Sequence, residues 1–138
     1  YIMSIYDMEG EDAMDIILSN VDGTPIYEQI TRQIKAKIVS GELQPGEALP
    51  SMRLLAKDLR ISVITTKRAY EELEREGFII SQTGRGSFVA PVGVELLKEE
   101  QLRQVEAHLE EAAKAAHLGN LEKDEFLEIA AAVFEEGI

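Results

Sequence analysis

The isoleucines between residues 26 and 38 recur every four positions, which predicts a helix with one buried apolar stripe. Thr24 is a favoured N-cap residue, Pro25 suits the first position of a helix, and Gly41 follows the last apolar position. The pattern therefore predicts a first helix that starts after Thr24 and ends at Gly41.

Two shorter helical segments follow a loop of proline and glycine residues at 43–50. Ser51 and Ser62 are predicted to cap them, because a serine hydroxyl can accept a free backbone N–H at the start of a helix. The turn between the two helices is short, near 60–62, and Gly77 ends the second. The predicted inward positions are Leu55, Ala56 and Leu59 on the first helix and Thr66, Ala69, Tyr70 and Leu73 on the second.

Strand-like runs occur in two regions. Residues 15–20, DIILSN, predict a short strand that a turn closes. Residues 78–82, FIISQ, and 86–90, GSFVA, predict a β-hairpin joined through the sequence TGR, because glycines stand where the hairpin needs a positive φ.

The C-terminal third of the chain is predicted to form two helices. Pro91 and Gly93 end the hairpin pattern, and Gly119 and Asn120 interrupt the helical pattern that follows, so we expect an αα-hairpin. A helix with an unsatisfied apolar face usually finds a partner chain. The expected dimer interface contains Leu102, Val105, Leu109, Phe126, Ile129, Val133 and Phe134.

Three helices followed by a β-hairpin make a winged helix-turn-helix pattern. The expected fold class is α+β, mainly α, with this domain followed by the αα-hairpin. We expect residues 1–14 to be an N-terminal extension, 15–91 to form the winged helix-turn-helix domain, and 92–138 to form a two-helix dimerisation region.

The formal net charge of −12 is unevenly distributed. Residues 1–23 carry −6 and residues 92–138 carry −8, whereas residues 24–91 carry +2. Only the middle of the chain is therefore electrostatically suited to nucleic acid. Within 53–68, five Lys or Arg residues face a single acid, Asp58.

Composition argues against several other classes of protein. The absence of cysteine excludes disulfides and thiolate chemistry, and no apolar run approaches the length of a membrane span. His108 and His117 lack the spacing of a metal pair, and no catalytic set of residues stands out, so we expect no metal, no cofactor and no enzymatic activity. The N-terminus does not resemble a signal peptide, and we expect a cytoplasmic protein without a membrane partner.

The segment GELQPGEALPSMRLLAKDLRISVITTKRAYEELEREGFIISQTGRGSFV resembles the DNA-binding domain of the GntR family of bacterial transcription regulators. Pro25, Tyr27, Gln29 and Ile30, together with AYEELEREG and the short two-helix tail, resemble the YtrA-type branch of that family. The resemblance covers residues 15–91 by motif. The roughly 45 residues that follow are too few for the large effector or aminotransferase-like domains of some relatives.

The resemblance implies a set of DNA contacts on the third helix, on the preceding helix and at the hairpin tip. These are Arg53, Ser62, Val63, Ile64, Thr65, Lys67, Arg68, Thr83, Gly84 and Arg85. Hydroxyls near a helix N-terminus can donate to phosphates, and the methyl groups of Val63 and Ile64 can pack on thymine methyls.

The sequence also departs from the family pattern. Polar residues are usual where Val63 and Ile64 stand, arginine where Lys67 stands, and glycine where Arg60 stands. Lysine lacks the fork with which arginine reads guanine, so the operator cannot be inherited from relatives. If Arg60 adopts a positive φ, it carries strain of about 1 kcal/mol.

Simpler roles remain open for several of these residues. Arg53 could be a solvated helix residue, and Val63 and Ile64 could pack as a hydrophobic staple. Arg68 could pair with Glu71 or Glu72 on its own helix. The sequence TGRG by itself could be any hairpin turn.

These features predict a sequence-specific DNA-binding regulator, a repressor that acts as a homodimer on a pseudo-palindromic operator. The branch resemblance suggests a transporter operon, and any small-molecule effector, of unknown identity, would bind between subunits. The alternative is a winged-helix protein-interaction module without DNA regulation, which the acidic termini favour.

Overall fold

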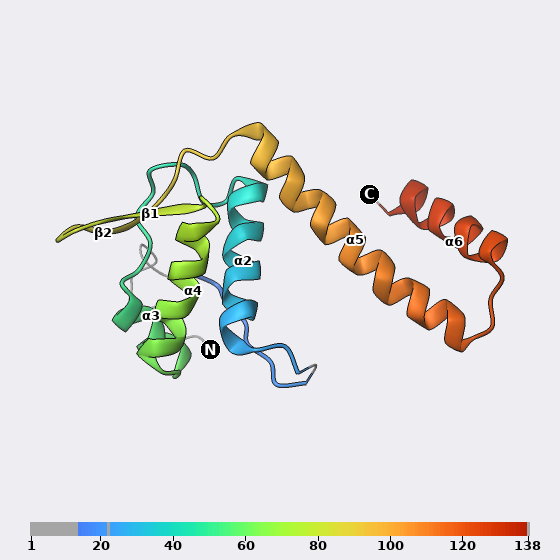
Figure 1. The fold of residues 1–138 in the computed structure, drawn as a ribbon, viewed down its shortest axis with the longest axis horizontal. Coiled ribbons are helices and arrows are strands. Elements are labelled where there is room, and N and C mark those ends of the chain that lie inside the picture. Colours follow the sequence, from blue (N-terminus) through green and yellow to red (C-terminus); the bar gives the residue numbers. More distant parts are fainter. Residues whose placement is uncertain (1–13, 22, 138) are drawn as a thin grey trace. The chain divides into compact units, whose positions relative to one another are not determined.

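The computed structural model describes residues 14–21 and 23–137, which contain five helices and two strands (Figure 1). The elements are α2 (Ile26–Ser40), α3 (Met52–Leu59), α4 (Val63–Arg75), β1 (Ile79–Gln82), β2 (Gly86–Val89), α5 (Val94–Leu118) and α6 (Lys123–Glu136). The chain divides into two compact units, the first ending at Leu97 and the second beginning at Lys98. The order of elements confirms the predicted α+β fold, mainly α, with a winged helix-turn-helix followed by two helices.

Helix α4 is central to the first unit, because it packs against α2, α3 and β1. All four positions predicted to point inward on α4 are buried, as are the isoleucines at 30, 34 and 38 on α2. Phe78, between α4 and β1, is completely buried and completes this core. The core therefore fixes one face of α4 and leaves the opposite face to solvent.

The helix starts follow the predicted serine caps. The Ser51 hydroxyl accepts the Leu54 N–H at 3.1 Å, and the Ser62 hydroxyl accepts the Ile64 N–H at 3.0 Å. At α2 the prediction was one residue early, because Pro25 has an extended ψ of 146° and is itself the N-cap. Gly41 ends α2 in the left-handed conformation, with φ of 86°.

Two buried hydroxyls tie α4 to the segment at the start of α3. The Thr66 hydroxyl lies 3.1 Å from the Met52 carbonyl and 2.9 Å from the Val63 carbonyl, while the Tyr70 hydroxyl donates to the Pro50 carbonyl at 2.7 Å. Burial raises the pKa of the Tyr70 phenol above its ordinary value, so the hydroxyl stays protonated and keeps its donor. These bonds place the first turns of α3 and α4 next to each other.

Strands β1 and β2 form an antiparallel hairpin, the wing, whose register pairs Ile79 with Val89 and Gln82 with Gly86. Residues 46–49, predicted only as loop, run beside β2 and share its backbone hydrogen bonds. The Leu49 N–H donates to the Ser87 carbonyl at 2.9 Å. This extra segment supports the base of the wing, and the wing tip projects away from the three helices (Figure 1).

The strand predicted at 15–20 is wrong. Residues 15–20 form no strand, and side chains of α2 bond their backbone instead. Gln33 bonds both backbone groups of Ile17, at 2.9 and 2.7 Å, and Gln29 bonds both of Ser19, at 2.8 and 2.7 Å. Most of the predicted extension, residues 1–13, lies outside the described residues.

The second unit consists of the rest of α5 and helix α6. Asn120, with φ of 55°, turns the chain between the two helices, and Glu122 with Glu125 forms a capping box at the start of α6. Helix α6 buries none of its residues. In the part of the chain that the structure describes, no helix combines the length and the apolar character needed to cross a membrane.

Candidate nucleic-acid interface

The first turn of α4 presents apolar side chains to solvent. Ile64 is 78% exposed and Val63 is 41% exposed, so two adjacent β-branched apolar side chains face solvent at this turn. The exposure of Ile64 argues against the alternative that it packs as a hydrophobic staple. Lys67 is also exposed and lies next to this turn, so the edge of α4 combines methyl groups with a cation.

The N-terminus of α4 is also suited to an anion. Its first turn contains no acidic residue, and its aligned N–H groups give this end a partial positive charge. Ser62 uses its oxygen to accept the Ile64 N–H, which leaves its hydroxyl proton available for donation. Thr65 is half-buried at the same end.

Helix α3 adds a second basic group beside this turn. Arg53 is exposed and immediately follows Met52, whose carbonyl lies against Thr66 of α4. The contact brings the start of α3, and with it the backbone of Arg53, to the N-terminal part of α4. Arg53 on α3 and Lys67 on α4 are both exposed cations near this junction of the two helices.

At the wing tip, Thr83, Gly84 and Arg85 are all exposed. Gly84 has a φ of 77°, and a Cβ atom added there would meet no neighbouring atom within 4 Å. Its backbone conformation, and not a lack of space, is therefore what requires glycine. The tip thus offers one arginine on a narrow and exposed turn.

Arg68 makes a contact that the sequence did not predict. Its guanidinium carbon lies 3.8 Å from the centre of the Tyr27 ring of α2. Glu72, one of the two acids considered as its partner, instead pairs with Arg75, whose pKa this hydrogen bond raises. In the sequence Tyr27 is only part of a motif, and the distance between α2 and α4 cannot be deduced from either helix alone.

Arg60 occupies the left-handed region in the turn of the helix-turn-helix, with φ of 59° and ψ of 47°. The positive φ considered for this residue is therefore confirmed. Its side chain is exposed, and glycine would carry no strain in this backbone conformation.

Replacing Arg60 with glycine is expected to stabilise the domain by up to about 1 kcal/mol, because the left-handed conformation is then unstrained. Urea denaturation of the two proteins measures the difference. Asn120→Gly is the matched control at the other positive-φ residue that is not glycine among the described residues, and its gain should be smaller because asparagine tolerates this conformation. A midpoint for Arg60→Gly at or below that of the wild type would show that the interactions of the Arg60 side chain outweigh the strain.

Comparison with known proteins identifies the family. The model described as "Bacterial regulatory proteins, gntR family" matches residues 26–89. The HTH-type transcriptional repressor YtrA of Bacillus subtilis is 36% identical over 105 residues, which covers 76% of this chain and 81% of YtrA. The chain belongs to the GntR family. Its similarity to YtrA over most of both chains supports the YtrA-type branch.

Two solved GntR-like structures extend this result. A GntR family transcriptional regulator from Listeria monocytogenes is 27% identical, has a TM-score of 0.67, and covers 81% of this chain and 97% of its own. The DNA-binding domain of AraR in complex with operator ORX1 is 25% identical, with a TM-score of 0.50, and covers 56% of this chain and 96% of its own. Like other GntR proteins, this chain is a DNA-binding transcription regulator and not an enzyme.

Proposed function

We propose that this GntR protein is a repressor that binds a pseudo-palindromic operator as a homodimer and reads bases with the first turn of α4. The observation that carries the proposal is the exposed edge of α4, where Ile64 stands 78% exposed beside Lys67 and the helix N-terminus. Apolar side chains displayed next to cations and N–H donors suit the major groove, which offers both thymine methyls and phosphates.

Each group has a proposed part in DNA binding. Val63 and Ile64 contact thymine methyls, Lys67 contacts phosphate or a base edge without the bidentate geometry of arginine, and Ser62 and Thr65 donate to phosphates. Arg53 adds a phosphate contact from α3. The wing tip, residues 83–85, approaches the minor groove, where Arg85 favours a narrow and negative site.

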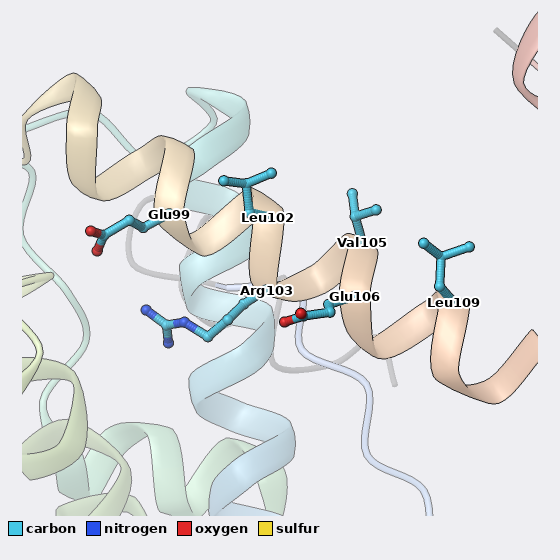
Figure 2. A pocket seen from close by; sticks show the side chains of 6 residues that line it. All are labelled: Glu99, Leu102, Arg103, Val105, Glu106 and Leu109. Atoms are coloured by element: carbon cyan, nitrogen blue, oxygen red, sulfur yellow. The ribbon is translucent and has the colours of Figure 1, made fainter. Parts of the chain in front are cut away.

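The apolar faces of the second unit support the proposed homodimer. On α5, Leu102, Val105 and Leu109 are each about half exposed and stand in one row, while Glu99, Arg103 and Glu106 occupy the neighbouring face (Figure 2). On α6, Val133 and Phe134 are 60% and 80% exposed. A second copy of the chain would cover these faces and pair charges of both signs across a two-fold axis.

The proposed dimer determines the form of the operator. Two-fold symmetry presents two copies of α4 to two half-sites in opposite orientations. Such a regulator works in the cytoplasm, where the chromosome lies. A small-molecule effector, if the protein has one, would act between the copies by changing the separation of the two α4 helices. The resemblance to the YtrA-type branch makes a transporter operon the first candidate for its target.

Selection of bound sequences from random duplex DNA tests the proposal. The wild-type protein is expected to enrich an inverted repeat, and Val63→Ala is expected to change the preferred base at one position in each half-site, because each mismatched base pair typically costs about 1–3 kcal/mol. An unchanged selection profile for Val63→Ala would show that Val63 does not contact a base. Absence of any enrichment by an intact dimer would favour the alternative of a protein-interaction module, to which the acidic ends of the chain point.

A further inference from the structure

Tyr27 of α2 lies under the guanidinium of Arg68 of α4, and we propose that Tyr27 is a positioning residue that holds Arg68 ready for a DNA phosphate. The inference rests on the proposed DNA-binding role of α4 and adds a residue outside the helix-turn-helix to it. Of these two residues, only Arg68 contacts DNA in the proposal, and Tyr27 acts by holding Arg68 in place.

The geometry leaves Arg68 free to bind while it is stacked. A guanidinium over a ring uses its flat face, with 3.8 Å between Cζ and the ring centre, and keeps its N–H donors at the edge. Tyr27 is half-buried and packs against the core, whereas Arg68 is exposed. An anchored ring therefore fixes the direction of a cation that still faces solvent.

Arg68 also lies on the same exposed face of α4 as Ile64. It follows the exposed Ile64 by four residues, which is about one turn, and it lies roughly opposite the buried Thr66 and Tyr70. Glu72, four residues after Arg68, pairs with Arg75. Arg68 is thus held on the face that the proposed function directs at DNA.

If Tyr27 positions Arg68, replacing Tyr27 should lower the affinity for DNA without changing the number of phosphates contacted. An arginine that is already held in place loses less conformational freedom when it binds. For each chain, removal of the ring is expected to weaken binding about 3- to 10-fold. Removal of the cation itself is expected to lower the slope of log affinity against log salt by about 0.9 for each chain, because one phosphate contact is lost.

A double-mutant cycle with Tyr27→Leu and Arg68→Ala tests the proposal on a duplex selected by the wild-type protein, titrated at several salt concentrations. Tyr27→Leu should weaken binding with an unchanged salt slope, and it should have no further effect in the Arg68→Ala background. Tyr27→Phe, which keeps the ring, should bind within about twofold of the wild type. An equal loss from Tyr27→Leu in both backgrounds would overturn the proposal, because the effect would then not pass through Arg68.

Arg68→Lys tests the same stacking interaction by changing the arginine, and it leaves Tyr27 intact. Lysine keeps the charge but has no flat face to stack, so the salt slope should hold while affinity falls about 3- to 10-fold for each chain. Wild-type affinity for Arg68→Lys would overturn the positioning role while the proposed function stands. Failure of the wild-type dimer to bind any duplex at low salt would instead defeat the proposed function itself.

Discussion

Val105→Asp is expected to convert the proposed homodimer into monomers and to weaken operator binding by about 100- to 10,000-fold, since the two half-sites are then no longer bound together. Val105 is 52% exposed in the single chain and stands in the middle of the apolar row on α5 (Figure 2). In a two-fold dimer the substitution would bury one carboxylate from each chain in an apolar interface. Sedimentation equilibrium and fluorescence anisotropy with operator DNA measure the two effects.

Ala107→Asp is the matched control for this experiment. Ala107 is exposed and lies two residues from Val105, on the opposite side of α5, so the change adds the same charge to the same helix without touching the apolar row. The control should remain dimeric and bind the operator as the wild type does. Val105→Asp that sediments as a dimer at micromolar concentration would exclude this face as the interface.

Ile64→Glu is expected to reduce operator binding at least about 100-fold, because a carboxylate placed against phosphates costs several kcal/mol in addition to the lost methyl contact. The side chain is 78% exposed, so the free energy of unfolding should change by no more than about 0.5 kcal/mol. Anisotropy titrations and urea denaturation separate the loss of binding from any loss of fold.

Ile17→Glu adds the same charge at an apolar residue of similar exposure, 75%, in the segment that lies along α2. It changes the net charge by the same amount, and its effect on binding should be small. If Ile64→Glu and Ile17→Glu weaken binding equally, the effect is one of total charge and the first turn of α4 does not face DNA.

Local patterns in the sequence were sufficient to predict most elements of the fold. The four-residue spacing of isoleucines and the serines at 51 and 62 indicated where helices form, because both act within one or two turns of the chain. The prediction of a strand at 15–20 was wrong because the partners of this segment lie on another element of the fold. Its backbone groups are bonded by two glutamine side chains on α2, and no periodicity within the segment could reveal this.

In the candidate interface too, some features follow from the local sequence and others depend on tertiary contacts. Exposure of Ile64 and Lys67 follows from the inward stripe of α4, which the sequence contains in full. The stack of Arg68 on Tyr27 depends on how closely α2 and α4 approach, so it required the tertiary structure. The positive φ of Arg60 was anticipated only because related sequences place glycine there.

The salt dependence of DNA binding tests the central claim, that the exposed edge of α4 contacts DNA, most directly. Log affinity of the wild-type protein should fall linearly with log salt, and Lys67→Ala should lower the slope by about 0.9 for each chain, because each proposed copy loses one phosphate contact. Arg75→Ala, which removes a cation paired with Glu72 farther along α4, should leave the slope unchanged. No measurable DNA binding at low salt by a dimer that is intact would contradict the account.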